Sequence, residues 1–222
     1  GALDCIIPGS GGKDSYFVAH RMIHEYGMHP LLVTWPPSIY TEWGWRNYMR
    51  WKELAPHVCY APAGKTHRLL TRLATENLGH FFQPFVIGQK NLAPRIAQVT
   101  GLKLCWYGEA ESEYGNKPSE FSTPFRDEAY YTGSGDIWLG GVHIDELKSR
   151  YGVTQAELDP YMPIRETNGL EVHYAGYYMK WHPQENYYFS SERGGFEPSP
   201  ERTPGTYSKY SGVDDMADDY HY

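Results

Sequence analysis

The chain has 222 residues, a length that suits one large domain or one domain with an appendage, and a formal net charge of −7 at pH 7. The acidic balance, with no block of basic residues, argues against a nucleic-acid substrate, and no apolar stretch approaches the roughly 20 residues of a membrane span. With no signal peptide and three widely spaced cysteines that form no C-x-x-C pair, the sequence predicts a cytoplasmic protein with buried, reduced thiols and neither a zinc ribbon nor a redox pair.

The first 110 residues alternate between strand and helix patterns. Short apolar runs typical of buried strands are followed by stretches in which apolar residues recur at helical spacing. The expected strands are 3–7, 30–34, 58–61 and 102–107, and the expected helices are 14–26, 43–54, 67–78 and 92–100. This alternation predicts an α/β domain built on a parallel, twisted sheet with helices on both faces.

The second half of the chain differs in composition and residue pattern, and it contains most of the tyrosines. Residues 109–142 are rich in Glu, Ser, Gly and Tyr and show little periodicity, which predicts a long functional loop or lid. Short helices are expected at 145–151 and 155–161, a strand at 171–181, and an ordered Pro/Gly/Ser-rich loop at 193–212. The last residues read as the start of a helix with no stop signal, so we expect the protein to continue beyond residue 222.

The most informative motif is S-G-G-K-D-S at residues 10–15, between the first strand and the first helix. At such a junction the free backbone N–H groups and the positive end of the helix dipole point at one spot, and glycines allow a phosphate to approach closely. Lys13 adds a mobile cation, and Ser10 and Ser15 add hydroxyl donors. A turn that merely joined a strand to a helix would need no Lys-Asp-Ser after its glycines. The motif therefore predicts a phosphate-binding loop.

The loop is not of the Walker A type, because Ile7 and Asp14 stand where that motif requires Gly and Ser or Thr. It resembles instead the pyrophosphate loop (PP-loop) of the ATP pyrophosphatase superfamily, whose members split ATP between its α and β phosphates. The resemblance implies an adenine nucleotide alpha hydrolase-like (HUP) fold and ATP as cofactor, with Lys13 and Asp14 as catalytic residues. The residues that it implies for ATP binding are Pro8, Ser10, Gly11, Gly12, Lys13, Asp14, Ser15, Thr34 and Trp35.

Two acidic residues that follow strand ends form a candidate Mg²⁺ site. In an open α/β sheet, ligands bind beyond the carboxyl ends of the strands, so residues 8–15 and 108–115 are expected to face one crevice. Asp14 would then hold a magnesium ion that bridges the ATP phosphates, and Glu109 would either complete this metal site or orient an amine nucleophile. Two plainer interpretations stay open: Asp14 is an ordinary acid of a first helical turn, and Glu109 belongs to a solvated acidic loop.

Further segments extend the resemblance over essentially the whole chain. They are P-L-L-V-T-W at 30–35, Y-G-E-A-E-S-E-Y-G at 107–115, W-H-P-Q-E-N-Y-Y-F at 181–189 and the stretch 201–222, which contains T-Y-S-K-Y. Together they resemble the N-acetyl sugar amidotransferases of bacterial surface-polysaccharide and lipopolysaccharide biosynthesis. Members of that family usually also have a cysteine-rich, zinc-ribbon-like segment before the first strand, and F-F-Q-P-F at 81–85 replaces another of their cysteine-containing segments.

The family resemblance implies two regions and one reaction. Residues 1–115 would form the PP-loop ATP pyrophosphatase core, and residues 116–222 a substrate-binding or lid extension packed on it. ATP would adenylate the acetamido oxygen of an N-acetyl sugar, which is nucleotide-linked in our interpretation, and ammonia would displace AMP to leave an acetamidino sugar. The ammonia would come from a separate glutaminase and cyclase-like pair, and neither nucleic acid nor a membrane would take part.

The expected sugar contacts come from residues 109–126 and the T-Y-S-K-Y segment. The candidates are Glu113, Tyr114, Lys209 and Tyr210, because tyrosine rings stack on sugars or bases and a lysine can meet a diphosphate. Alternatively, Tyr207 and Tyr210 only pack the tail onto the sheet. Other functions also stay open: a tRNA thiolase, which the acidic charge and missing cysteine pair disfavour, an amide synthetase, or a nucleotide-binding module without catalysis.

Overall fold

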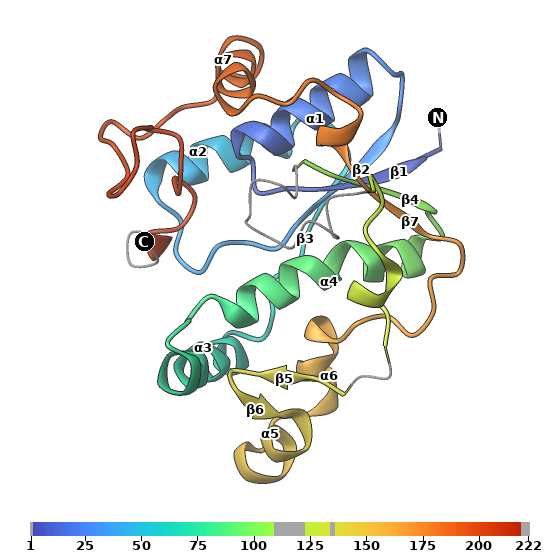
Figure 1. Cartoon of the computed structure of the whole chain (residues 1–222), viewed down its shortest axis with the longest axis vertical. Helices are drawn as coiled ribbons and strands as arrows, with labels where there is room; N and C mark the ends of the chain where they lie inside the picture. Colours follow the sequence, from blue (N-terminus) through green and yellow to red (C-terminus); the bar gives the residue numbers. More distant parts are fainter. Residues whose placement is uncertain (1, 109–122, 134–135, 219–222) are drawn as a thin grey trace.

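A parallel sheet forms the centre of the computed structural model, which describes residues 2–108, 123–133 and 136–218. The sheet has five strands in the order β3–β2–β1–β4–β7, and every neighbouring pair is parallel (Figure 1). The strands are β1 (Cys5–Pro8), β2 (Pro30–Thr34), β3 (His57–Cys59), β4 (Leu104–Tyr107) and β7 (Glu171–Tyr174). The predicted α/β fold is confirmed, and the strand that leads into S-G-G-K-D-S lies in the middle of the sheet.

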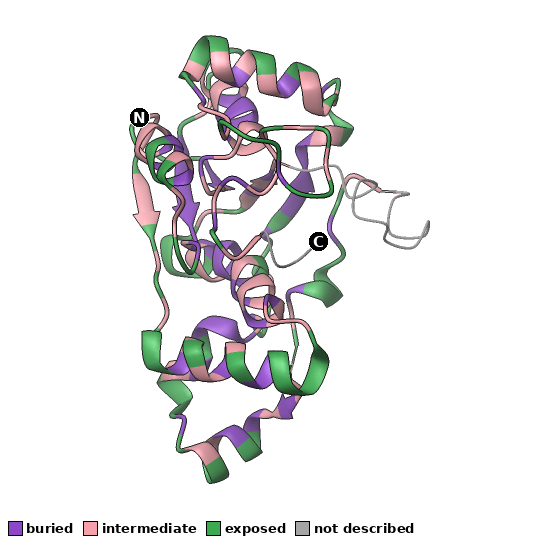
Figure 2. Cartoon of the chain, turned by 90° about the vertical axis from the view of Figure 1, so that its left-hand side faces the viewer, coloured by how far each residue is buried: buried purple, intermediate pink, exposed green. Residues whose placement is uncertain are grey.

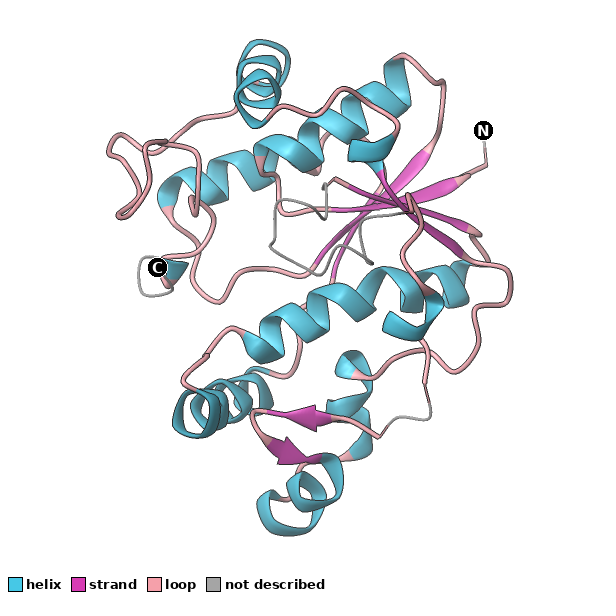
Figure 3. Cartoon of the chain, in the orientation of Figure 1, coloured by secondary structure: helices cyan, strands magenta, loops and turns pink. Residues whose placement is uncertain are grey.

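The central strand supplies side chains to two cores, one on each face of the sheet. Cys5 and Ile7 point into one core and Ile6 into the other, because successive side chains of a strand alternate between its faces. Figure 3 shows the resulting layers, and Figure 2 shows buried residues concentrated on the sheet and on the inward sides of the helices. The first core is covered by α1 (Lys13–His24) and α2 (Glu42–Trp51), and the second by α3 (Gly64–Leu78) and α4 (Gln83–Thr100).

A small unit extends the second core below α3 and α4 (Figure 1). Gly140 and Gly141, both with positive φ, form the tight turn of a two-stranded hairpin. Leu139, Leu147 and Leu158 from this unit are fully buried in the same core as the sheet. Its elements are β5 (Trp138–Leu139), β6 (Val142–His143), α5 (Ile144–Tyr151) and α6 (Gln155–Leu158).

The second half of the chain contributes more to the core than the sequence predicted. The sheet does not end at residue 115, because β7 pairs with β4 and adds a fifth strand. The strand expected over 171–181 stops at Tyr174, where a 3₁₀ turn over Ala175–Tyr177 begins. After that turn, α7 (Pro183–Gly194), which we did not predict, packs along α1.

Two other expectations are wrong in detail. Cys59 is exposed, whereas Cys5 and Cys105 are buried thiols as predicted. The helix expected over 92–100 begins nine residues earlier, at Gln83, and it continues through Pro94. No described helix is long and apolar enough to cross a membrane.

Substitution of Gly88 tests the packing of α4 on the sheet. An added Cβ would lie 2.3 Å from the Trp35 ring, so we expect Gly88→Ala to lower the free energy of unfolding by about 1–3 kcal/mol, the usual range for overpacking a core. Chemical denaturation measures this value. The matched control is Gly64→Ala, whose nearest contact would be Arg68 Nη1 at 3.4 Å; an equal loss in both variants would contradict the packing argument.

Candidate functional site

The loop 10–15, which follows β1, is tightly constrained by its neighbours. Gly11 has φ +96°, and a Cβ there would lie 2.8 Å from the backbone oxygen of Asn47 in α2. Gly12 is the N-cap of α1, and no side chain of the described residues caps that helix end. The first N–H groups of α1 therefore have no intrahelical partner and can meet an anion.

Buried hydrogen bonds fix the start of this loop from below. The Thr34 hydroxyl donates to the Gly9 carbonyl oxygen at 2.6 Å and accepts from Trp51 Nε1 at 3.2 Å. Nε2 of His57 lies 2.9 Å from the same hydroxyl. Thr34 is fully buried and Trp35 is packed against Gly88, so neither side chain lines the cavity described below. Their predicted contact with ATP gains no support from these positions.

The first turn of α1 is clamped by α7. Asp14 Oδ2 lies 2.5 Å from Lys13 Nζ, and Asp14 Oδ1 accepts from Asn186 Nδ2 at 2.9 Å. The hydroxyl of Ser190, one turn after Asn186, donates to the Lys13 carbonyl oxygen at 2.6 Å. Neither clamp residue was predicted from the sequence, although their i, i+4 spacing places them on one face of a helix.

The C-terminal segment lies over the loop from the other side. The Ser10 hydroxyl donates to Asp214 Oδ2, and Lys13 Nζ lies 5.1 Å from the centre of the Tyr210 ring. The Tyr210 hydroxyl donates to Gln184 at 3.0 Å, and its ring stacks on Tyr187 at 4.8 Å. Tyr210 therefore lies next to the loop 10–15 and also packs the C-terminal segment against α7.

Main-chain contacts dock this segment on the loop that follows β2. Thr41 donates from its hydroxyl to the Val213 carbonyl oxygen and from its N–H to the Asp214 carbonyl oxygen at 3.1 Å. The buried carboxylate of Asp215 accepts from the N–H groups of Ser38 and Ile39. Residues 213–215 are thus bound by residues 38–41, which lie more than 170 positions earlier in the sequence.

Asp214 is electrostatically unusual. Its Oδ1 atom is excluded from solvent and has no hydrogen-bond partner among the described residues. Burial raises the pKa of Asp214 above the ordinary value of 3.8; the hydrogen bond from Ser10 opposes this shift, and the nearby charge of Asp215 adds to it. The environment therefore favours a neutral carboxyl group beside Ser10.

These elements enclose a cavity of about 440 Å³, which is large enough for a small-molecule ligand. One wall is the loop 10–15 with the tail over it, and the opposite wall comes from α4 and the segment around residue 126. The lining residues outside the loop and the tail are Pro8, Gly9, Gln89, Lys90, Tyr107, Gly108, Arg126, Tyr174 and Pro183. The cavity lies at the carboxyl ends of β1 and β4, where α/β sheets bind ligands.

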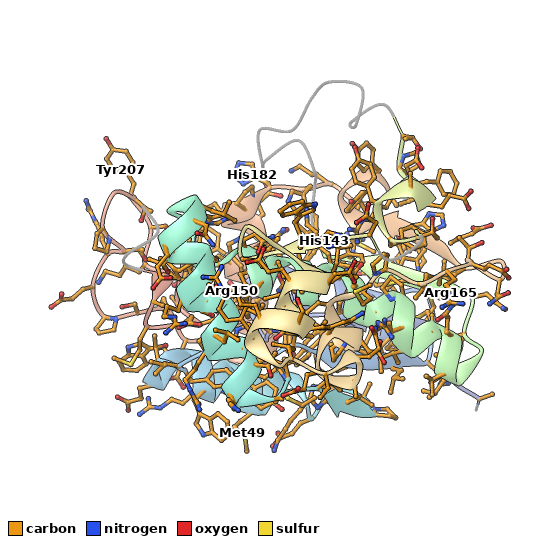
Figure 4. The ribbon with its side chains drawn as sticks, turned by 90° about the horizontal axis from the view of Figure 1, so that it is seen from below. Met49, His143, Arg150, Arg165, His182 and Tyr207 are labelled. Atoms are coloured by element: carbon orange, nitrogen blue, oxygen red, sulfur yellow. The ribbon has the colours of Figure 1, made fainter. Side chains whose placement is uncertain are left out.

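The structure brings together some of the predicted site residues and not others. Pro8, Ser10, Gly12, Lys13, Asp14, Ser15 and Tyr210 line the cavity, whereas Gly11 is turned toward α2. The Ser15 hydroxyl donates within the loop, to the Gly12 carbonyl oxygen at 3.0 Å. Lys209 is exposed and donates to the Pro200 carbonyl oxygen, and Tyr207, 96% exposed, points away from the molecule (Figure 4). Glu109, Glu113 and Tyr114 lie outside the described residues.

The described residues do not form a magnesium site by themselves. They contain no group of three or more His, Cys, Asp or Glu side chains that could hold a metal ion. Both carboxylate oxygens of Asp14 are already paired, with Lys13 and Asn186. The assignment of Mg²⁺ to Asp14 and Glu109 stays a prediction.

Comparisons with known proteins give only distant similarity. No known family model matches the chain, and no curated protein matches it. A predicted subunit of tRNA methyltransferase from Methanocaldococcus jannaschii is 11% identical, with 86% of this chain and 76% of that chain covered and a TM-score of 0.41. NMN synthetase from Francisella tularensis is 16% identical, with coverages of 90% and 80% and a TM-score of 0.38. At these values neither structure carries an inference about activity.

Substitution of Gly44 tests the docking of the tail. A Cβ on Gly44 would lie 2.6 Å from the Asp214 carbonyl oxygen and 2.7 Å from its Cα, so Gly44→Ala should displace residues 213–216. We expect faster amide hydrogen exchange in that segment, measured by mass spectrometry, with the sheet still protected. Gly64→Ala should leave this exchange unchanged. Equal protection of the tail in wild type and Gly44→Ala would show that the tail does not depend on this contact.

The raised pKa of Asp214 predicts a pH-dependent stability difference between wild type and Asp214→Asn. When the pKa of a carboxyl group is higher in the folded than in the unfolded protein, the free energy of unfolding falls as the pH rises from the unfolded-state pKa through the folded-state pKa. Asparagine has no such titration, so the variant should melt at a higher temperature than wild type at neutral pH, with the gap closing below pH 3.8. A melting-temperature series across pH measures this gap, and a gap that does not change with pH would refute it.

Proposed function

We propose that this protein is an ATP-dependent adenylating enzyme of the PP-loop type. The observation that carries the proposal is the loop 10–15, which presents a lysine, a serine and an uncapped helix start to a ligand-sized cavity at the carboxyl end of the central strand. An uncapped helix start of this kind binds phosphate through backbone N–H groups. We place the phosphates of ATP against this loop.

Each polar group around the loop has a task in this proposal. The N–H groups of the first turn and the ammonium of Lys13 stabilise the charge that develops on the departing pyrophosphate. The clamp from Asn186 and Ser190 holds that turn in place before ATP binds. Burial raises the pKa of Asp214 and so disfavours its charged form, which lessens the repulsion between this carboxyl group and a bound phosphate.

We further propose that the acceptor is an N-acetyl sugar, on the resemblance of the motif segments to the sugar amidotransferases. The acetamido oxygen attacks the α phosphorus, the bond to the β-phosphate oxygen breaks, and pyrophosphate leaves. Ammonia then adds to the activated carbon, and AMP departs with the former amide oxygen. An amide oxygen is a poor leaving group, so this activation is the physical reason for using ATP. We propose a separate glutaminase and cyclase-like pair as the source of ammonia.

Lys13→Ala tests the assignment of the loop. Loss of one electrostatic donor to the leaving group should slow pyrophosphate release by about 10²–10³-fold. The rate is measured with a coupled pyrophosphate assay in the presence of MgATP, ammonia and candidate N-acetyl sugar nucleotides. Lys65→Ala is a matched control, because Lys65 also follows a glycine in the first turn of a helix but is exposed and does not line the cavity. Unchanged turnover in Lys13→Ala would exclude the loop from catalysis.

The identity of the acceptor product separates the proposed reaction from its alternatives. Conversion of an acetamido to an acetamidino group replaces one oxygen with an NH group, which mass spectrometry of the sugar detects. A sulfur-containing or amide product would assign another adenylating reaction. ATP binding with no pyrophosphate release for any acceptor would indicate a binding module without catalysis.

A further inference from the structure

Arg126 lies in the cavity wall opposite the loop 10–15 and has an uncommon environment. Its side chain is nine-tenths buried, at 7% exposure for the residue. No carboxylate of the described residues forms an ion pair with it, although a buried arginine is nearly always paired. Its guanidinium lies 5.6 Å from the Tyr107 ring centre and 5.9 Å from the Tyr131 ring centre. Cation–π interactions with these two rings partly compensate for the missing counter-ion.

A proline in α4 positions this guanidinium. Residue 94 would normally donate its N–H to the carbonyl oxygen of Lys90, but Pro94 has no N–H to give. The released Lys90 carbonyl oxygen accepts instead from the Tyr107 hydroxyl at 3.1 Å and from Arg126 Nη1 at 3.2 Å. The Arg126 backbone N–H donates to the Val172 carbonyl oxygen at 2.9 Å, which fixes the residue to β7.

One edge of the guanidinium stays available to a ligand. Only Nη1 has a hydrogen-bond partner among the described residues, so Nε and Nη2 keep their protons for a ligand in the cavity. Two parallel N–H groups of this kind match a phosphate or carboxylate oxygen pair. The exposed Lys90 side chain lines the same wall and adds positive charge there.

The position of Arg126 separates it from the loop that binds ATP in our proposal. Arg126 is attached to β7, and β4 lies between β7 and β1 in the sheet. Its guanidinium reaches back to Tyr107 of β4, and among the described residues no hydrogen bond or ion pair joins it to residues 10–15, so the loop and Arg126 present two separate groups of donors to the cavity. Lys209, which we expected to meet a diphosphate, is engaged with Pro200 outside the cavity.

We propose that Arg126 binds the phosphate or diphosphate group of the second substrate, the molecule that receives AMP. This inference rests on the proposed function, because it assumes that ATP occupies the loop 10–15. Arg126 then anchors the acceptor by its charged end while the acceptor's reacting oxygen reaches the α phosphorus between the two walls. Pro94 acts as a positioning residue, since it frees the carbonyl oxygen that orients the guanidinium.

The test measures two ligands separately by titration calorimetry. Wild type is first titrated with α,β-methylene-ATP, and the saturated protein is then titrated with uridine diphosphate as the probe of the second anion site. Arg126→Gln should weaken uridine diphosphate binding by about 10- to 100-fold and leave binding of the ATP analogue unchanged. Arg126→Lys keeps the charge but loses the fork, so we expect an intermediate loss.

Two controls separate recognition from folding. Arg95→Gln removes a half-buried arginine whose Nε also donates to a backbone oxygen, that of Met162 at 3.0 Å, but which lines a different cavity. It should not change either titration. Pro94→Ala returns an N–H to the Lys90 carbonyl oxygen and should weaken uridine diphosphate binding while the ATP analogue still binds.

The possible outcomes bear on different claims. Failure of wild type to bind the ATP analogue would overturn the proposed function and this inference with it. Normal binding of the analogue overturns the inference alone if wild type does not bind uridine diphosphate, or if the Arg126 variants bind it as wild type does. Loss of the analogue with retention of uridine diphosphate in Arg126→Gln would assign Arg126 to ATP and also overturn the inference.

Discussion

The hydroxyl group of Thr34 holds the candidate site to the sheet. It donates its one proton to the Gly9 carbonyl oxygen, so Trp51 Nε1 and His57 Nε2 must act as donors to its lone pairs. All of these groups lie at least partly out of solvent, where an unmatched polar atom would be costly. The exit of the chain from β1 is therefore set by an interaction that joins β1, β2, β3 and α2.

A loop held in this way can bind an anion without first being ordered. Gly11 is pressed against the backbone of α2, and the first turn of α1 is held by two side chains of α7. Ligand binding then loses little conformational entropy at the loop, and the N–H groups already point to one place. This arrangement has a cost, because the Asp214 carboxyl is kept beside Ser10 although one of its oxygen atoms has no hydrogen-bond partner among the described residues.

The sequence was informative where local pattern and structure coincide. β2 has the predicted bounds, and the S-G-G-K-D-S loop stands between a strand and a helix as expected, because glycine turns and apolar runs depend on neighbouring residues. The sequence was less informative where long-range contacts determine whether a segment folds and which of its residues are buried. α7 has few apolar residues at helical spacing, and its inward polar residues Asn186 and Ser190 are buried only because α1 lies against them.

The same difficulty explains why Arg126 was not identified as a candidate. An isolated arginine in a polar stretch reads as a surface residue. Its burial depends on the rings of Tyr107 and Tyr131 and on a carbonyl oxygen released by Pro94, and no local pattern connects these positions.

The joining of Ser10 to Asp214 has a consequence for synthesis on the ribosome. These two residues are 204 positions apart, and translation adds about 5–20 residues per second, so the loop emerges roughly 10–40 s before its covering segment. The clamp residues Asn186 and Ser190 are also synthesised late, so during most of that interval the loop has neither its clamp nor its cover. The preordered anion site is therefore completed only when the last part of the chain has left the ribosome.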